Sequence, residues 1–366
     1  MTPSSEKELS ELLQFANGPV DVIGGNTRSD SPRRGMQLST THLSGIVDYI
    51  PGALTMVARA GTPLSEIEET LLAEGQQLAF EPLILDQVMG RAGQSTIGGV
   101  FATNSSGSRR IQAGAARDFL LGVRFIDGSG RLIKNGGRVM KNVTGYDLVK
   151  LMAGSWGTLG VLTEVSFKVL PRPESNATLI LALSDHNEAV SAMAAALGSA
   201  YDVSGTAYLP SEEQCMIRVE GFPKSAAHRV ACLKEKLKAF GEIEVLKDAI
   251  AKELWEDMRR LGSLKYADDE LWRISVKPSD GPEVFAKVGF KSGFYDWAGG
   301  LIWGVLTAGN DPRHILEDFE GHATRIKGRD QTVAKFHPKS EVIRDLNSAI
   351  RKRFDPKGIL NVGLMG

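Results

Sequence analysis

The stretch GQSTIGGVFATNSSGSRR, from Gly93 to Arg110, crowds glycines, hydroxyl side chains and an asparagine together and ends in two arginines. It is too polar for a buried strand, while Ile97, Val100 and Phe101 make it too apolar for a plain linker. Glycine is used where the main chain needs a positive φ or where another group approaches it closely. The stretch therefore predicts either a series of tight turns or a loop whose main chain contacts a ligand.

A second glycine-rich segment, IGGNTRSD from Ile23 to Asp30, follows the short apolar run VDV. Two segments that both follow apolar runs and both carry Ser, Thr and Asn favour a ligand over simple turns. Exposed main-chain N–H groups and short hydroxyls form a concave anion site, and a helix beginning near Thr96 would add positive partial charge. A diphosphate is an anion that fits such a pair of loops.

Two common phosphate-binding motifs are missing from the sequence. No G-x-x-x-x-G-K-[ST] occurs, which argues against a P-loop nucleotide hydrolase. The pair Gly128 and Gly130 has Ile133 where the third glycine of the dinucleotide motif G-x-G-x-x-G belongs, and it lies in an expected hairpin. A nucleotide bound by this chain would therefore be held by a non-Rossmann arrangement.

The composition is that of an ordinary globular protein of 366 residues, 42% hydrophobic and 24% charged, with a formal net charge of -1. A near-neutral chain has no electrostatic attraction to nucleic acid or to an anionic membrane. Its two cysteines, Cys215 and Cys232, are too few for a disulfide framework or an iron–sulfur cluster. The apolar run from Trp297 to Gly309 is too short for a membrane span, and the N-terminus lacks the features of a signal peptide. We expect a cytoplasmic protein.

The pattern of apolar residues predicts an α+β fold. Strict alternation from Val161 to Val169 predicts a half-buried antiparallel strand, and DGSG at 127–130 predicts the turn of a hairpin. A short helix is expected over 147–153. Beyond Pro173 the chain changes to helices rich in Ala, Lys and Glu between short strands, which predicts a second α+β domain.

Three motifs occur in a fixed order along the chain: VIGGNTRSD at 22–30, STIGGVFATNSSGSRRIQAG at 95–114, and KNVTGYDLVKLMAGSWGTLGVLTEVSFKVLPRP at 141–173. Together they resemble the FAD-binding domain of the vanillyl alcohol oxidase family, the p-cresol methylhydroxylase (PCMH) type. The terminal FDPKGILNVG, at 354–363, is similar to the segment that closes proteins of this family. Within the family, the motifs look closest to the FAD-binding subunits of glycolate oxidase.

This resemblance implies a particular domain organisation. Residues 1–173 would form a PCMH-type FAD-binding domain of two α+β subdomains, and residues 174–335 a smaller α+β cap on the substrate side. Residues 336–366 would form a helix and a tail that return to the FAD-binding domain. The apolar face of that helix comprises Val342, Ile343, Leu346 and Ile350.

The resemblance also implies which residues bind the cofactor. The first wall around the pyrophosphate of FAD would comprise Gly24, Gly25, Asn26, Thr27, Arg28 and Ser29. The second wall would comprise Thr96, Ile97, Gly98, Gly99, Ala102, Thr103, Asn104 and Gly107, with Gly114 close by. The flavin would lie against Pro82, Gly157, Gly160 and Val161.

Several polar residues near these segments have two interpretations each. Tyr146 and Asp147 would lie near the flavin ring, although Asp147 is better explained as the N-cap of a helix. Arg109 and Arg110 would either balance the charge of the diphosphate or form a solvated pair. Arg273, in an apolar strand-like setting, would either bind a carboxylate or form a structural ion pair, and the ion pair is favoured.

The sequence departs from its relatives at two functional positions. Asn26 stands where some relatives carry the histidine that attaches FAD covalently, so we expect non-covalent FAD. Relatives that oxidise 2-hydroxy acids carry a Glu-His-Gly-x-Gly stretch and paired histidines late in the chain, whereas this chain has only isolated His314, His322 and His337 there. No catalytic residue can therefore be assigned, and no metal is expected.

Two functions fit these features. The first is the FAD-binding subunit of a glycolate oxidase complex, which oxidises glycolate to glyoxylate. In that complex the chain would mainly carry flavin for electron transfer, beside a catalytic FAD sister subunit and an iron–sulfur subunit that place it at the inner face of the membrane. The second is a stand-alone FAD-dependent 2-hydroxy acid dehydrogenase. A third alternative is a subunit that keeps the fold and binds no flavin.

Overall fold

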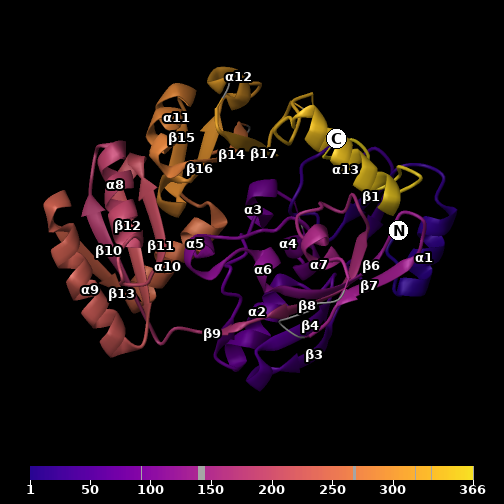
Figure 1. Ribbon diagram of the computed structural model, residues 1–366, viewed down its shortest axis with the longest axis horizontal. Helices are drawn as coiled ribbons and strands as arrows, with labels where there is room; N and C mark the ends of the chain where they lie inside the picture. The colour runs from indigo at the N-terminus through magenta and orange to yellow at the C-terminus, as the bar shows by residue number, and fades with distance from the viewer. Residues whose placement is uncertain (92, 139–144, 267–268, 318, 331, 366) are drawn as a thin grey trace. The chain divides into compact units, whose positions relative to one another are not determined.

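The computed structural model describes residues 1–91, 93–138, 145–266, 269–317, 319–330 and 332–365, which form two compact units (Figure 1). Unit 1 comprises residues 1–106, 114–172 and 338–366, and unit 2 comprises residues 107–113 and 173–337. Helices account for 35% and strands for 28% of the structure, which confirms the mixed fold class. The short segment 107–113 belongs to unit 2 although the chain on both sides of it belongs to unit 1.

Unit 1 is built around a five-stranded antiparallel sheet with the order β3-β4-β8-β6-β7. Its strands are β3 (Ile46–Ile50), β4 (Thr55–Arg59), β6 (Leu120–Ile126), β7 (Leu132–Gly136) and β8 (Val161–Lys168). In the central strand β8, Val161, Val165 and Phe167 are fully buried and Glu164 and Lys168 are partly exposed, as the alternation predicts. Leu162 and Ser166 are buried as well, so β8 is more buried than the half-buried strand that the sequence predicts. The predicted hairpin joins β6 to β7, and Asp127 accepts hydrogen bonds from the main-chain N–H groups of Ser129 and Arg131 at its turn.

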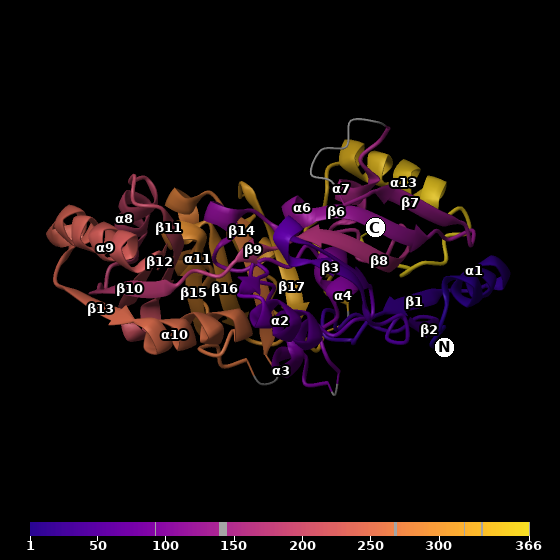
Figure 2. The same cartoon turned by 90° about the horizontal axis from the view of Figure 1, so that it is seen from below.

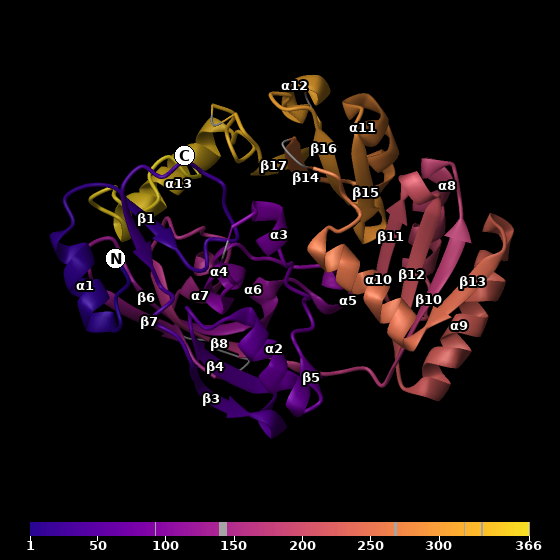
Figure 3. The ribbon, with the colours of Figure 1, turned by 180° about the vertical axis from the view of Figure 1, so that it is seen from behind.

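A smaller sheet in unit 1 joins the two ends of the chain. Strands β1 (Val20–Ile23) and β2 (Met36–Ser39) pair in parallel, and Leu360 forms an isolated bridge to Val20. Helix α1 (Glu6–Phe15) buries Leu9 and Leu13 in an apolar cluster that also contains Val20 and Leu360. The cluster comprises Leu9, Leu13, Val20, Leu38, Leu43, Ile126, Val161, Ile359 and Leu360. One core therefore joins the N-terminal helix, the C-terminal tail and the central sheet (Figure 3).

The remaining elements of unit 1 surround these sheets. They are α2 (Leu64–Ala73), β5 (Gln76–Gln77), α3 (Asp86–Met89), α4 (Ile97–Ala102), α6 (Ala116–Phe119), α7 (Leu148–Met152), β9 (Leu170–Pro171) and α13 (Glu341–Phe354). Helix α13 forms where the sequence predicts it, but Val342, Ile343 and Leu346 of its apolar face are exposed. The helix is anchored near its end instead, where Arg351 donates hydrogen bonds to the carbonyls of Leu360 and Leu364.

Unit 2 contains an eight-stranded antiparallel sheet with the order β13-β10-β12-β11-β15-β16-β14-β17. Its strands are β10 (Ser175–Ala182), β11 (Val203–Leu209), β12 (Gln214–Gly221), β13 (Ile243–Lys247), β14 (Glu270–Val276), β15 (Ser292–Asp296), β16 (Leu301–Leu306) and β17 (Gly321–Lys327). Its helices are α5 (Arg110–Ala113), α8 (His186–Leu197), α9 (Pro223–Leu237), α10 (Asp248–Arg260), α11 (Gly281–Val288) and α12 (Pro312–Leu316).

The two faces of this sheet differ in character. One face joins helices α8, α9 and α11 in an apolar core that includes Leu179, Ile217 and Trp272. Helix α10 lies on the other face (Figure 2), where Trp255 donates a hydrogen bond to Thr178 over 2.9 Å. On this face, Trp255 of α10 also stacks on the guanidinium of the buried Arg218 of β12.

An ion pair on helix α1 leads to a first prediction. The Glu6 carboxylate accepts hydrogen bonds from Arg124 of β6 and from Thr163 of β8, and its pKa lies below its usual range chiefly because of Arg124. Since both charged side chains are partly exposed, we expect Glu6→Gln to lower the free energy of unfolding by about 1 kcal/mol near pH 7.

The pH dependence follows from the lowered pKa. The unfolded chain holds this proton more tightly than the folded chain, so the stabilisation is present above about pH 4.3 and is lost as pH falls through the folded pKa. Urea unfolding of wild type and Glu6→Gln at several pH values measures the difference. A difference that grows at acid pH would contradict the prediction.

Candidate functional site

The two glycine-rich segments lie against each other in unit 1. Gly24 and Gly25 follow directly after β1, and a Cβ added to Gly25 would lie 1.5 Å from the carbonyl oxygen of Gln94. In the other direction, a Cβ on Gly93 would lie 1.9 Å from the carbonyl oxygen of Gly25. The main chains of the two segments therefore contact directly, and any side chain at Gly25 would force them apart.

The first segment presents main-chain N–H groups that the rest of the described structure does not use. Within that part of the chain, the N–H groups of Gly25, Asn26 and Thr27 donate no hydrogen bond. Asn26 adopts a left-handed conformation with φ of 59°, and Gly25 and Asn26 are half-buried. Successive N–H groups in such a turn form a nest that binds anions.

Two arginines that the sequence analysis did not select converge on this nest. The Asn26 side-chain oxygen accepts hydrogen bonds from Arg91, over 2.7 Å, and from Arg33. Arg91 also donates to the carbonyl of Ser29. Burial and then the nearby charge of Arg91 lower the pKa of Arg33, so two like charges are held close together beside the free N–H groups. Their only signal in the sequence is that each flanks a glycine-rich segment.

Arg28 and Thr27 connect the two segments. Arg28 is buried and donates hydrogen bonds to Ser105 over 2.9 Å and to Ser95 over 3.4 Å. The hydroxyl of Thr27 lies 3.0 Å from that of Ser95, which donates to Asp86. Both residues of the predicted first wall thus bind the second segment.

The predicted second wall combines packing residues with residues that face the first wall. Thr96 caps helix α4 by accepting a hydrogen bond from the N–H of Gly99, and a Cβ on Gly24 would lie 2.4 Å from its hydroxyl. Gly98 has another role, because a Cβ there would lie 2.6 Å from the Cβ of Ala60. Helix α4 also begins at Ile97, which is fully buried.

The end of α4 contacts the turn that follows helix α7. The carbonyl of Ala102 accepts a hydrogen bond from the N–H of Trp156 over 2.9 Å. Thr103 and Asn104 are half-buried, and Asn104 accepts a hydrogen bond from the N–H of Arg117. The structure therefore brings the second segment beside the GSWGTLG motif.

Asn361 of the closing motif joins this turn to the first wall. Its side-chain N–H donates to the carbonyl of Trp156 over 2.7 Å, and its oxygen accepts from the N–H of Val22 over 2.7 Å. A Cβ on Gly157, whose φ is 71°, would lie 2.9 Å from this amide. Gly160 instead accommodates Phe125, and Val161 lies in the core beneath the sheet.

Three other predicted positions have surroundings of their own. Pro82 is buried, next to Glu81 in a left-handed conformation, and Gly114 has a φ of 101° beside Asp118. Gly107 belongs to unit 2, where its carbonyl accepts a hydrogen bond from the Trp297 indole over 3.0 Å. Their proposed contacts with a cofactor stay predictions.

The donor set of unit 1 fits a dinucleotide. Gly24 and Gly25 have no side chains that would cover the main chain, and the N–H groups of the nest lie beside two arginines. The hydroxyl of Ser155 is buried and has no hydrogen-bond partner among the described residues. A buried polar atom without a partner is rare in folded proteins and calls for an explanation such as a ligand. These features suit the phosphates and polar groups of FAD.

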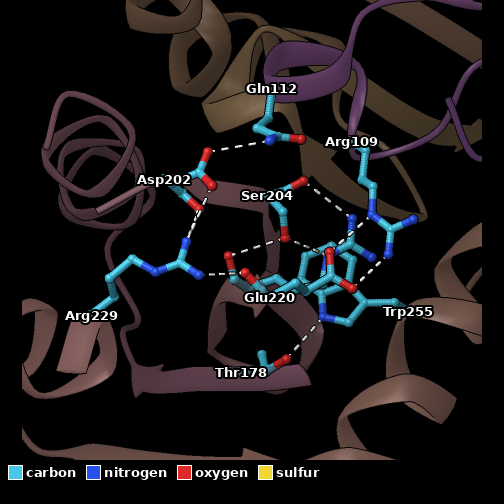
Figure 4. A network of polar contacts seen from close by, with 9 residues as sticks. Arg109, Gln112, Thr178, Asp202, Ser204, Glu220, Arg229 and Trp255 are labelled. Atoms are coloured by element: carbon cyan, nitrogen blue, oxygen red, sulfur yellow. Dashed lines mark hydrogen bonds and ion pairs between the residues drawn. The ribbon is translucent and has the colours of Figure 1, made fainter. Parts of the chain in front are cut away.

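The 107–113 segment is held in unit 2 by a polar network (Figure 4). Arg109 forms a buried ion pair with Glu220, with N–O distances of 2.9 and 2.5 Å. Gln112 donates to Asp202, and Arg218, stacked on Trp255, forms a second pair with Glu220 over 3.4 Å. Arg109 is therefore a buried, ion-paired residue of unit 2 and not part of a solvated pair.

Other predicted polar residues have simpler roles. Tyr146 is 88% exposed, and Asp147 caps helix α7 by accepting a hydrogen bond from the N–H of Lys150. His314 lies on α12 and His322 on β17, while the His337 ring packs on Phe319. Among the described residues, no group of three or more His, Cys, Asp or Glu side chains is placed to hold a metal ion.

Comparison with known proteins gives this geometry a family. Residues 1–136 match the model of the family described as an FAD binding domain. The chain is 36% identical over 351 residues to glycolate oxidase subunit GlcE of Escherichia coli K12, which covers 95% of this chain and 92% of that protein. It is 32% identical over 190 residues to glycolate oxidase subunit GlcD of Bacillus subtilis, covering 49% of this chain and 38% of that one.

Two further similarities concern part of the sequence and the fold. A D-lactate dehydrogenase of Archaeoglobus fulgidus is 31% identical over 177 residues, which is 46% of this chain and 38% of that protein. The solved structure of an alkyldihydroxyacetonephosphate synthase superposes with a TM-score of 0.71 at 16% identity, over 99% of this chain and 76% of that one. The contacting glycine-rich segments thus belong to an FAD binding domain, and the chain belongs to the glycolate oxidase subunit GlcE family of FAD-linked oxidoreductases.

Proposed function

We propose that this chain is the FAD-binding subunit of a complex that oxidises glycolate to glyoxylate, and that it mainly carries flavin for electron transfer. The observation that supports this most is the nest at Gly25, Asn26 and Thr27, in main-chain contact with the second glycine-rich segment. The similarity to GlcE over nearly the whole chain supports the substrate.

The residues of unit 1 would bind the cofactor through its phosphates. The free N–H groups of the nest would donate hydrogen bonds to the pyrophosphate, and Arg33 and Arg91 would balance its charge. When bound, FAD supplies a hydride acceptor that passes electrons on. The side chain of Asn26 cannot make the histidine linkage that some relatives carry, so the FAD would be non-covalent.

The proposal includes partner subunits. GlcE and GlcD are both named as subunits of glycolate oxidase, which supports assembly into a complex. We propose a catalytic FAD sister subunit and an iron–sulfur subunit as partners, because this chain has only two cysteines, one of them buried with its pKa raised to about 12. Electrons would then leave through another chain.

No helix in the described part of the chain is long and apolar enough to cross a membrane. We propose a cytoplasmic location, with the partner subunits holding the chain at the inner face of the membrane.

An anaerobic assay tests this function. The purified chain is loaded with FAD, glycolate or D-lactate is added without oxygen, and the visible absorption of the flavin is followed. We expect the flavin to stay oxidised in the isolated chain and to be reduced once the sister subunit is added. A preparation that takes up no FAD would overturn the proposal.

The alternative is a stand-alone 2-hydroxy acid dehydrogenase. The similarity to a D-lactate dehydrogenase favours it. So does Arg273 of unit 2, whose guanidinium stacks on the Trp297 ring and makes no hydrogen bond with the residues that the structure describes. Rapid bleaching of the flavin in the isolated chain would support this alternative and would exclude a role in electron transfer alone.

A further inference from the structure

The C-terminal tail of unit 1 pairs with the strand that leads into the first glycine-rich segment. Val20 of β1 donates its main-chain N–H to the carbonyl of Ile359 over 2.7 Å, and its own carbonyl accepts from the N–H of Asn361 over 2.9 Å. The buried carboxylate of Asp355 holds this part of the tail, because it accepts a hydrogen bond from the N–H of Ile359. The tail therefore acts as a further strand beside β1.

The side chain of Asn361 continues this pairing where the main chain of the tail turns away. Asn361 has a left-handed φ of 43°, so the tail does not continue as a strand beyond it. Its side-chain oxygen accepts a hydrogen bond from the N–H of Val22 over 2.7 Å, two residues beyond Val20 on β1. The amide oxygen thus takes the place that a main-chain carbonyl would have in a longer strand.

The nitrogen of the same amide holds the turn at Trp156 and Gly157. It donates to the carbonyl of Trp156 over 2.7 Å, and the N–H of Trp156 donates to the carbonyl of Ala102 over 2.9 Å. Both residues of the turn are left-handed, with a φ of 54° at Trp156 and of 71° at Gly157. A left-handed residue other than glycine costs free energy and persists only where its surroundings hold it. Asn361 and Ala102 hold this one from its two sides.

Asn361 thereby connects three parts of the proposed FAD site. Strand β1 leads into the nest, helix α4 of the second glycine-rich segment ends at Ala102, and the proposed contact with the flavin is at Gly157. An asparagine amide carries an acceptor and a donor on the same carbon, whereas a carboxylate carries acceptors alone and an apolar side chain carries neither. The connection therefore depends on the residue type at position 361.

We propose that Asn361 is a positioning residue for the cofactor, whose amide fixes the nest and the turn at Gly157 in the arrangement that FAD requires. A site that is already held in its bound shape binds more tightly, because less conformational freedom is lost on binding. Asn361 acts through the main chains of Val22 and Trp156 and needs no contact with FAD itself. The inference rests on the proposed function, because it concerns the same cofactor site.

Titration of the FAD-free full chain with FAD between pH 8 and pH 5 tests this role. Quenching of flavin fluorescence reports binding, and the melting temperature of the FAD-free protein reports folding. Asn361→Ala removes both hydrogen bonds of the side chain. Asn361→Asp keeps the size and the acceptor for Val22, but it places a second acceptor against the carbonyl of Trp156. Asn347→Asp is the matched control, because it makes the same change at an exposed position of α13.

We expect Asn361→Ala to raise the Kd for FAD about 10-fold relative to the wild type. Asn361→Asp at pH 8 should raise it at least as much, because the carboxylate repels the carbonyl of Trp156. The half-buried carboxyl faces this carbonyl, so its pKa should lie above the ordinary value of about 3.9. Once protonated, it donates to the carbonyl as the amide does, and the Kd of this variant relative to the wild type should fall towards pH 5.

The ratio to the wild type should stay constant over this range for Asn361→Ala, and for Asn347→Asp it should stay at one. A purely structural role would lower the melting temperature but would produce no such pH profile. Wild-type affinity in both Asn361 variants, or a ratio for Asn361→Asp that does not change with pH, would overturn this inference and leave the proposed function standing. A wild-type chain that takes up no FAD would overturn both.

Discussion

Gly25→Ala is expected to produce a folded chain that has lost most of its affinity for FAD. The added Cβ would lie 1.5 Å from the carbonyl oxygen of Gln94, and a main-chain atom cannot move aside as the end of a side chain can. The first segment must then separate from the second, which displaces the N–H groups of the nest. Overpacking of this kind costs about 3 kcal/mol at the upper end, which corresponds to a roughly 100-fold higher Kd.

Titration of the FAD-free protein with FAD, followed by the quenching of flavin fluorescence, measures this effect. Gly18→Ala is the matched control, since no atom lies within 4 Å of the added Cβ and its affinity should stay unchanged. Gly24→Ala should fall between the two, because its Cβ meets the side chain of Thr96, whose hydroxyl can rotate away with the loss of its cap on α4. Equal affinities for all three variants would show that the contact of the two segments does not shape the FAD site.

Arg109→Met is expected to cause the largest loss of stability in unit 2. The substitution removes the guanidinium that contacts both carboxylate oxygens of Glu220, which stays buried with Arg218 at 3.4 Å. Breaking a buried ion pair by removing one partner costs about 3 kcal/mol or more. For a unit of this size the melting temperature should fall by about 6–12 °C. The 107–113 segment should also be released, so trypsin should cleave after Arg110 faster than in the wild type.

An exposed ion pair on α9 and the turn after it provides the control for Arg109. Lys238 and Glu235 pair at the surface of unit 2, and Lys238→Met should not change the melting temperature measurably. The double variant Arg109→Met/Glu220→Gln should lose less stability than the sum of the losses in the two single variants, because it leaves no unpaired carboxylate. Strict additivity would mean that the two side chains do not interact.

Much of the fold could be predicted from local patterns. The two-residue period of apolar side chains in β8 is the period of any strand with one buried face. The DGSG turn has the residue types that a hairpin turn requires in any protein. The FAD binding domain was likewise predictable, because three glycine-rich motifs in a fixed order resemble a known family. The sequence analysis ascribed the glycines to a ligand, whereas the structure shows that at Gly25 a second main chain excludes the side chain. Such a signal is visible in the sequence, because glycine is the residue type that lacks a side chain.

Other features of the site had no such local signal. Gly98 looks like a nest residue in the sequence, but it serves the packing of α4 on Ala60. Arg33 and Arg91 are 58 positions apart and meet only at Asn26. Arg109 seemed to belong to the cofactor segment that surrounds it, yet its partner is Glu220 on β12 of the second unit.

The sequence by itself determined the main-chain geometry of this protein: where strands alternate, where turns occur and where glycine lets two loops contact. These properties depend on neighbouring residues and on the shape of one residue at a time. Only the tertiary structure decided which charges meet, because the partners of Asn26, Glu220 and Trp297 come from distant segments that sheet pairing brings together. Charge pairing depends on distance in space, and one sequence alone does not contain that distance.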